Sequence, residues 1–177
     1  MTEVEWLEAT EPEPMLAWAQ RNGLLSRHKL AVFFVSCCDC LKPLIANEPA
    51  PMIINWHDED SPDAMTDAMR HLSDAVWESI RMLRIKTGDC ALLAANIRDI
   101  FGPFPFRSIT LKSAWLISTV VALANAIYKE KAFDYLPVLA DALQDAGCDI
   151  EYVLNHCRQP SEHVRGCWVV DLLTGRT

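Results

Sequence analysis

The sequence is poor in glycine, and it lacks the glycine-rich motifs that bind phosphates or support a nucleophile. Only six glycines occur in 177 residues, and none of the patterns G-x-x-x-x-G-K-[ST], G-x-G-x-x-G and G-x-S-x-G is present. In such motifs, backbone N–H groups hold a phosphate or an oxyanion. The sequence therefore lacks the motifs that usually indicate a nucleotide-binding protein or a hydrolase.

Basic clusters are also lacking. Sixteen Lys and Arg residues stand against 24 Asp and Glu residues, which gives a formal net charge of -8, and no basic run is longer than a pair. Binding to nucleic acid requires a concentrated basic face, because it must neutralise phosphates. The composition therefore predicts that nucleic acid is not a partner of this acidic protein.

No apolar run is long enough to cross a membrane. The longest, AWLISTVVALANAIY, spans 15 residues and contains Ser118, Thr119 and Asn125, whereas a membrane helix needs about 20 apolar residues. The start, MTEVEWLEAT, carries acids where an export signal needs basic residues and an apolar run. We therefore expect no membrane association and a cytoplasmic location, where the seven cysteines stay reduced.

Strand patterns are almost missing, and PMIINW is the only short β-like run. Helical periodicity and helix-ending residues recur along the rest of the chain. The sequence predicts an all-α fold, an irregular bundle of six to nine mostly short helices. We expect one domain over 1–177, with N-terminal helices in 1–42, a Pro-rich and acidic connector in 43–60 and the main helical body in 61–177.

Several helix boundaries can be predicted from local chemistry. Thr2 with Glu5 and Thr10 with Glu13 have the spacing of capping boxes, and Ser26 is placed to cap the following helix. The later helices are expected over 62–87, 91–101, 115–128 and 133–146, followed by one capped by Asp149 and a last one capped by Ser161.

Four segments resemble a family of uncharacterised helical proteins abundant in planctomycete-type bacteria. They are MTEVEWLEATEPEPML, FFVSCCDC, IRDIFGPFPFR and the tail LPVLADALQDAGCDIEYVLNHCRQPSEHVRGCWVVDLL. The resemblance covers the first forty residues and the last eighty or so. Family members usually have a longer alanine-rich helical stretch in the middle. The resemblance implies a helical cytosolic protein and no particular mechanism.

The segment HCRQPSEHVRGCW places two histidines and two cysteines close together. If Ser161 caps the last helix, His163 and Cys167 are four residues apart on one helical face, a spacing that zinc ligands can use. Cys148, His156 or Cys157 from the preceding helix would have to complete the site. These five residues are the candidate metal ligands.

Two other interpretations of this segment remain open. In the first, Cys167 fills space in an apolar helical stripe, and no cofactor is bound. In the second, Cys157 or Cys167 is a nucleophile with His163 as its base, although no oxyanion loop accompanies either.

Two further clusters contain residues of the types that bind metals. Cys37, Cys38 and Cys40 lie on a helix and could join the C-terminal residues in a mixed Cys/His zinc centre, and their alternative role is that of buried thiols. The acidic segment from His57 to Asp63 could bind a hard cation but has no EF-hand frame.

The leading functional hypothesis is a non-catalytic helical module that acts through a protein partner or self-association. Its support is the missing catalytic motifs together with six tryptophans, some of which could form an exposed interface. A structural zinc protein is the alternative, and a cysteine-dependent enzyme is the third possibility.

Overall fold

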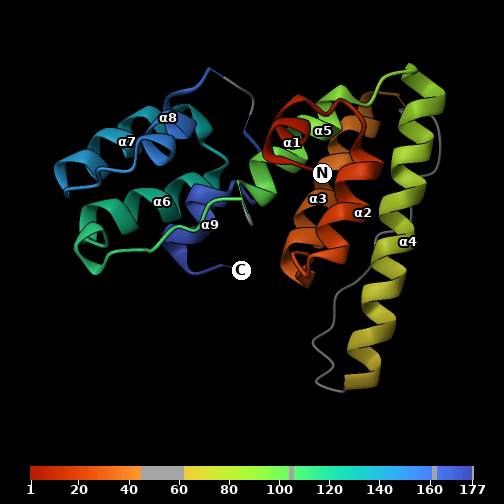
Figure 1. The fold of residues 1–177 in the computed structure, drawn as a ribbon, viewed down its shortest axis with the longest axis horizontal. Helices are drawn as coiled ribbons and strands as arrows, with labels where there is room; N and C mark the ends of the chain where they lie inside the picture. Colours follow the sequence, from red (N-terminus) through yellow and green to blue (C-terminus); the bar gives the residue numbers. More distant parts are fainter. Residues whose placement is uncertain (45–61, 104–105, 161–162, 177) are drawn as a thin grey trace. The chain divides into compact units, whose positions relative to one another are not determined.

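The computed structural model describes residues 1–44, 62–103, 106–160 and 163–176, with only the backbone given for 62–69. Over these residues the chain forms nine α-helices, three short 3₁₀ helices and no strand (Figure 1). The predicted all-α fold is therefore confirmed. The β-like run at 51–56 and nearly all of the 43–60 connector lie outside the described residues. None of the described helices combines the length and apolarity needed to cross a bilayer.

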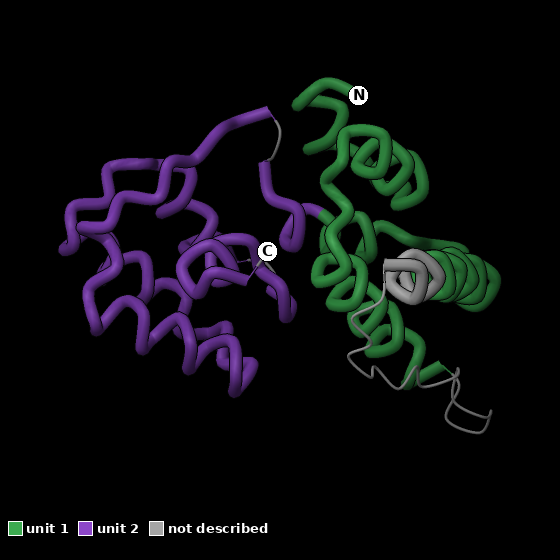
Figure 2. The backbone as a smooth tube through the Cα atoms, turned by 90° about the horizontal axis from the view of Figure 1, so that it is seen from below, with its two compact units in different colours: residues 1–97 green, residues 98–177 purple. Residues whose placement is uncertain are grey.

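The chain divides into two compact units, residues 1–97 and 98–177 (Figure 2). The single domain expected over 1–177 stays a prediction. The first unit contains α1 (Glu3–Glu8), α2 (Pro12–Arg21), α3 (Arg27–Leu41), η1 (Lys42–Leu44), α4 (Pro62–Thr87) and most of α5 (Ala91–Phe101). In it, the long helix α4 packs along α3.

Local capping interactions determine several helix starts in the first unit. The Glu5 N–H donates to the Thr2 hydroxyl at 3.2 Å, and the Thr2 N–H donates to the Glu5 carboxylate at 2.6 Å, so the predicted capping box is confirmed. Ser26 caps α3 by accepting the Lys29 N–H at 3.2 Å. Each contact joins residues three positions apart, which is why the sequence pattern predicted it.

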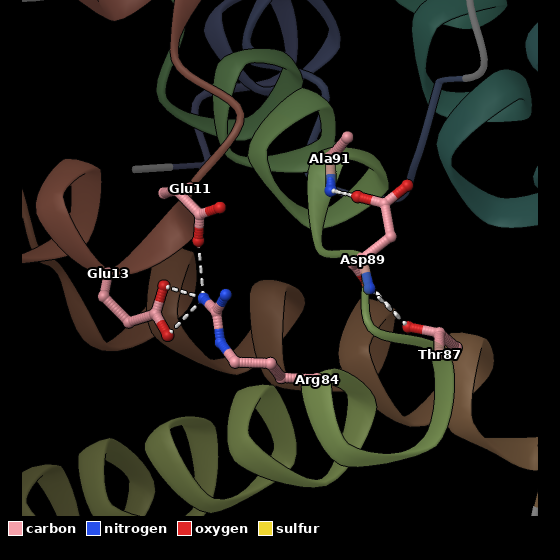
Figure 3. A network of polar contacts seen from close by, with 6 residues as sticks. All are labelled: Glu11, Glu13, Arg84, Thr87, Asp89 and Ala91. Carbon is pink, nitrogen blue, oxygen red and sulfur yellow. Dashed lines mark hydrogen bonds and ion pairs between the residues drawn. The ribbon is translucent and has the colours of Figure 1, made fainter.

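The second predicted capping box, Thr10 with Glu13, is wrong. Helix α2 begins at Pro12, and its N-cap residue Glu11 makes no side-chain capping bond. The Glu11 and Glu13 carboxylates instead accept hydrogen bonds from Arg84 of α4, at 2.6 and 2.7 Å (Figure 3). The Glu13 carboxylate is therefore engaged by Arg84 and does not complete the expected capping box with Thr10.

The turn between α4 and α5 is also held by side chains. The Asp89 N–H donates to the Thr87 hydroxyl, and the Asp89 carboxylate accepts the Ala91 N–H at the start of α5 at 2.8 Å (Figure 3). This contact satisfies one of the N–H groups that a helix start leaves without a partner in the helix. The predicted bounds of α4 and α5 are confirmed.

The second unit contains the end of α5, η2 (Ser113–Trp115), α6 (Ser118–Glu130), η3 (Phe133–Tyr135), α7 (Leu136–Asp145), α8 (Glu151–Arg158) and α9 (Trp168–Thr174). Helix α7 packs against α6 and α8, and α9 packs against α6 (Figure 1). These helices enclose an apolar core to which Trp115, Leu139, Val153 and Val169 contribute.

Four predicted helix starts in the second unit differ from the structure. The helices expected from 115 and 133 begin three residues later, at Ser118 and Leu136. The helix α8 has Ile150 as its N-cap and no side-chain capping bond. The carboxylate of Asp149, which was expected to cap it, accepts a hydrogen bond from Lys112 at 3.0 Å. The last helix, α9, begins at Trp168, and Ser161, its expected cap, lies outside the described residues.

The segment that precedes α9 is not helical. Gly166 has a φ of 95°, a left-handed value that an α-helix does not contain, and Cys167 is the N-cap residue of α9. His163 and Cys167 therefore do not share a helical face, because the turn at Gly166 separates them.

Candidate metal centre

Four side chains of the second unit converge on one point. Asp99 lies near the end of α5, His156 lies on α8, His163 precedes α9, and Cys167 is the N-cap residue of α9. One donor atom from each, a carboxylate oxygen, two imidazole nitrogens and a sulfur, lies within 4.8 Å of all the others. The fold thus assembles a four-donor cluster from three helix ends and a loop.

The four donor atoms lie close together, and the nearest pair is at hydrogen-bonding distance. Oδ1 of Asp99 is 2.6 Å from Nδ1 of His163 and 3.1 Å from Nε2 of His156. The Cys167 sulfur is 3.3 Å from Nε2 of His156 and 4.0 Å from Nδ1 of His163. Tetrahedral zinc, with bonds of about 2.0 to 2.3 Å, separates its ligand atoms by about 3.3 to 3.8 Å. The observed separations lie on both sides of this range.

The Asp99 carboxylate is buried and held in a fixed orientation. Its residue is only 5% exposed, and its Oδ2 accepts the backbone N–H of Val164 at 2.8 Å, which leaves Oδ1 directed at the two histidines. Burial acts to raise the pKa of Asp99, but hydrogen bonds from His156 and His163 outweigh it and hold the pKa below its ordinary value. The contacts with the two histidines therefore favour the charged carboxylate, the form that can bind a cation.

Each imidazole directs a single nitrogen at the cluster. Nε2 of His156 contacts both Cys167 and Asp99, and Nδ1 of His163 contacts the same two residues. In a Cys-His-Asp triad the base uses one ring nitrogen for the nucleophile and the other for the acid. Contact of both partners with one nitrogen is instead the arrangement of two ligands that share a cation.

The Cys167 thiol is unsuited to act as a free nucleophile. Its residue is fully buried, and burial, followed by the negative charge of Asp99, raises its pKa well above the ordinary value. Burial likewise raises the pKa of Cys157 to about 12. A nucleophilic cysteine needs a lowered pKa and access to substrate, so the cysteine-enzyme hypothesis finds no support at either residue. A bound cation would favour the Cys167 thiolate directly.

The structure separates the five candidate ligands into two groups. His156, His163 and Cys167 belong to the cluster, whereas Cys148 and Cys157 do not. The latter two are buried core residues of the second unit. Cys157 follows His156 on α8 and therefore points about 100° away from it around the helix axis.

Asp99 was missed by the sequence analysis. It lies in the last turn of the apolar helix α5, at the end where the helix dipole disfavours a negative charge. A carboxylate in that position needs a hydrogen-bond donor or a positive charge from another part of the chain to offset its unfavourable interaction with the helix dipole. This unfavourable position is the sequence signal that pointed to Asp99.

The cluster of Cys37, Cys38 and Cys40 is not part of such a site in the described part of the chain. No further convergent group of three or more His, Cys, Asp or Glu donors occurs in the described part of the chain. Cys37 is buried on α3, and Cys38 and Cys40 are half-buried. His57 and the acids up to Asp60 lie outside the described residues, as does the side chain of Asp63.

Comparisons with protein-family models, curated proteins and solved structures found no match to this chain. The family resemblance noted from the sequence therefore stays a prediction. The geometry of the four-donor cluster is the main observation that bears on function.

Proposed function

We propose that the second unit is a structural zinc-binding helical module. The observation that carries the proposal is the convergence of the Asp99, His156, His163 and Cys167 donor atoms within 4.8 Å of one another. Thiolate, imidazole and carboxylate are the ligand types that zinc takes in proteins, and four of them complete a tetrahedral site.

The charge of the donor set suits a divalent ion. Two neutral imidazoles, one carboxylate and one thiolate carry two negative charges, which a Zn²⁺ ion neutralises. A neutral centre suits a buried position, because an uncompensated buried charge costs several kcal/mol. Asp99, His163 and Cys167 are nearly inaccessible to solvent, and the His156 side chain is 16% exposed.

The completed donor set favours a structural over a catalytic ion. His156, His163 and Asp99 are also the residue types of two-histidine, one-carboxylate iron sites, which keep coordination positions open for substrate. Here Cys167 provides a fourth protein ligand, and a catalytic zinc usually has only three. The ion would connect the end of α5 with α8 and the start of α9, elements that are distant in sequence.

Zinc content of the purified full-length protein tests the proposal. We expect about one zinc per chain, and its loss in His163→Ala and Cys167→Ser variants. Cys148→Ser is the matched control, because it removes a buried cysteine outside the cluster, and we expect it to retain zinc. Wild-type protein prepared without chelators that holds less than about a tenth of an equivalent of zinc would contradict the proposal.

We also propose that the protein as a whole, and not the second unit alone, acts through protein contacts. The observation behind this second role is a set of large apolar side chains that are more than half exposed. They are Val4, Leu7, Ile85, Tyr135 and Val138. None of the described tryptophans is exposed: Trp6, Trp115 and Trp168 are buried, and Trp18 and Trp77 are half-buried. Trp56 lies outside the described residues, so the expectation that some tryptophans form an exposed interface stays a prediction. A strict monomer in sedimentation experiments, with no partner recovered from native lysate, would contradict this role.

A further inference from the structure

Trp168 lies next to two of the proposed metal ligands. It follows the ligand Cys167 directly, begins α9 and is only 4% exposed. Its ring lies 5.0 Å from the ring of the ligand His156, centroid to centroid, with a tilt of 45°. It also stacks on Tyr152 at 6.1 Å, one turn before His156 on α8. Trp168 thus contacts the helix that carries one ligand and is bonded to another.

Trp168 also contacts a glycine. Gly102 follows α5, three residues after the ligand Asp99, and has a φ of 63°. A Cβ atom added there would lie 2.7 Å from Cγ of Trp168 and 3.0 Å from Cδ1 and Cδ2. These distances are shorter than any van der Waals contact. The indole ring therefore packs against the backbone at a place that has no room for a side chain.

We propose that Gly102 and Trp168 are positioning residues of the metal centre. The pair sets the approach of the end of α5, which carries Asp99, to α8 and to the start of α9, which carry His156 and Cys167. This inference rests on the proposed zinc function. Residues that orient metal ligands from outside the coordination sphere commonly change affinity when they are altered.

A methyl group at position 102 would act on two ligands at once. The Trp168 ring would have to move away from the added methyl group, and this ring lies 5.0 Å from the ring of His156. Because Cys167 and Trp168 are consecutive, the same movement would shift the Cys167 sulfur. Coordination tolerates little displacement, since zinc–ligand distances vary by only about 0.2 Å. The methyl group should therefore weaken zinc binding specifically.

The test compares Gly102→Ala with Gly175→Ala in the full-length chain. Gly175 ends α9 with a φ of 69° and has nothing within 4 Å of an added Cβ. Both substitutions impose the same backbone strain, and only the first displaces Trp168. Zinc affinity is measured by competition with a chromophoric chelator. We expect a loss of about 10- to 100-fold for Gly102→Ala and an affinity close to wild type for Gly175→Ala.

Two further measurements keep the test decisive. Cobalt(II) substituted for zinc should show a sulfur-to-metal absorption band in the wild-type protein. We expect this band to be altered in Gly102→Ala and unchanged in Gly175→Ala. A role of Gly102 in stability alone would not alter the band. If Gly102→Ala does not fold by circular dichroism, Trp168→Phe and Trp168→Leu replace it. We expect Phe to retain most of the affinity and Leu to lose it.

Equal zinc affinities for the two glycine variants would overturn the positioning role, and so would a wild-type affinity in Trp168→Leu. Either result would leave the zinc proposal intact. A wild-type chain that binds neither zinc nor cobalt would overturn both.

Discussion

The carboxylate of Asp99 accepts the backbone N–H of Val164 at 2.8 Å, although 65 positions separate the two residues. This bond ties the loop before α9 to the end of α5, and it directs the second carboxylate oxygen toward His156 and His163. The two histidines and Cys167 then present their donor atoms to the same point. The first prediction tests the residue on which this arrangement depends.

Replacing Asp99 by Asn should weaken zinc binding without removing the contact to Val164. The amide has nearly the same shape and can still accept the Val164 N–H, but the site would then carry one uncompensated positive charge. We expect zinc affinity to fall by at least about tenfold, as measured by chelator competition. Asp149→Asn is the control, because Asp149 is an exposed partner of Lys112. Equal affinities in the two variants would rule out Asp99 as a ligand.

Removal of the metal should lower the thermal stability of the protein. A ligand that binds only the folded state stabilises it by about 2.7 kcal/mol when present at a hundred times its dissociation constant. One kcal/mol corresponds to a Tm change of about 4–8 °C in a domain of 60–100 residues. We expect a chelator to lower the Tm by several degrees and added zinc to restore it, as followed by scanning calorimetry. A Tm that stays constant while zinc is lost would contradict this prediction.

The buried thiol of Cys157 should make the fold less stable at alkaline pH. Its pKa in the folded chain is raised to about 12 by burial, against about 8.5 for an exposed thiol. Between these values the unfolded chain loses a proton that the folded chain keeps, so stability declines as pH rises. By this linkage, wild type should lose about 2 kcal/mol between pH 8 and pH 10 from Cys157 alone.

Urea unfolding of wild type and Cys157→Ala at the two pH values measures this difference. The alanine variant is less stable at both pH values because it leaves a small cavity. Its decline with pH should nevertheless be smaller, because the ionising thiol is gone. Equal declines would show that the Cys157 thiol has an ordinary pKa in the folded protein.

The ion pairs of Arg84 should contribute little to stability. The Arg84 side chain joins Glu11 and Glu13 across two helices, but 40% of its surface is exposed. Exposed ion pairs typically contribute about 0.2 to 1 kcal/mol and are screened by salt. We expect Arg84→Met to lower the free energy of unfolding only slightly, with a smaller effect at high salt. The control is Arg81→Met, which breaks a pair with Glu78 within a single helix. A larger loss in Arg84→Met that persists at high salt would contradict this view.

Predictions from the sequence succeeded where the interaction is local. Thr2 and Ser26 cap helices through residues three positions away, so their patterns are complete within a few letters of sequence. Thr10 and Asp149 have equally good patterns, and both predictions failed. In each case a carboxylate at the helix start pairs with a distant cation, Arg84 or Lys112. A local sequence pattern cannot show that a distant cation competes with the helix start for the same carboxylate.

The four-donor cluster shows the same division. Three of its members, His156, His163 and Cys167, come from one short segment, and all three are among the candidates predicted from the sequence. The helical spacing assumed for His163 and Cys167 was wrong, because Gly166 turns the chain between them. The fourth member, Asp99, lies 64 positions before His163, and only its contacts with His163 and Val164 in the folded chain identify it.

By itself, the sequence determined the all-α class, most helix boundaries and the residue types available to bind a metal. Periodicity and capping act over three or four residues, so a single stretch of chain contains that information. Tertiary structure alone decided which donors meet, because burial of the apolar helix faces brings the end of α5 to α8 and α9. The same packing leaves Cys148 and Cys157 in the core and places the carboxylate of Asp99 beside two imidazoles and a thiol.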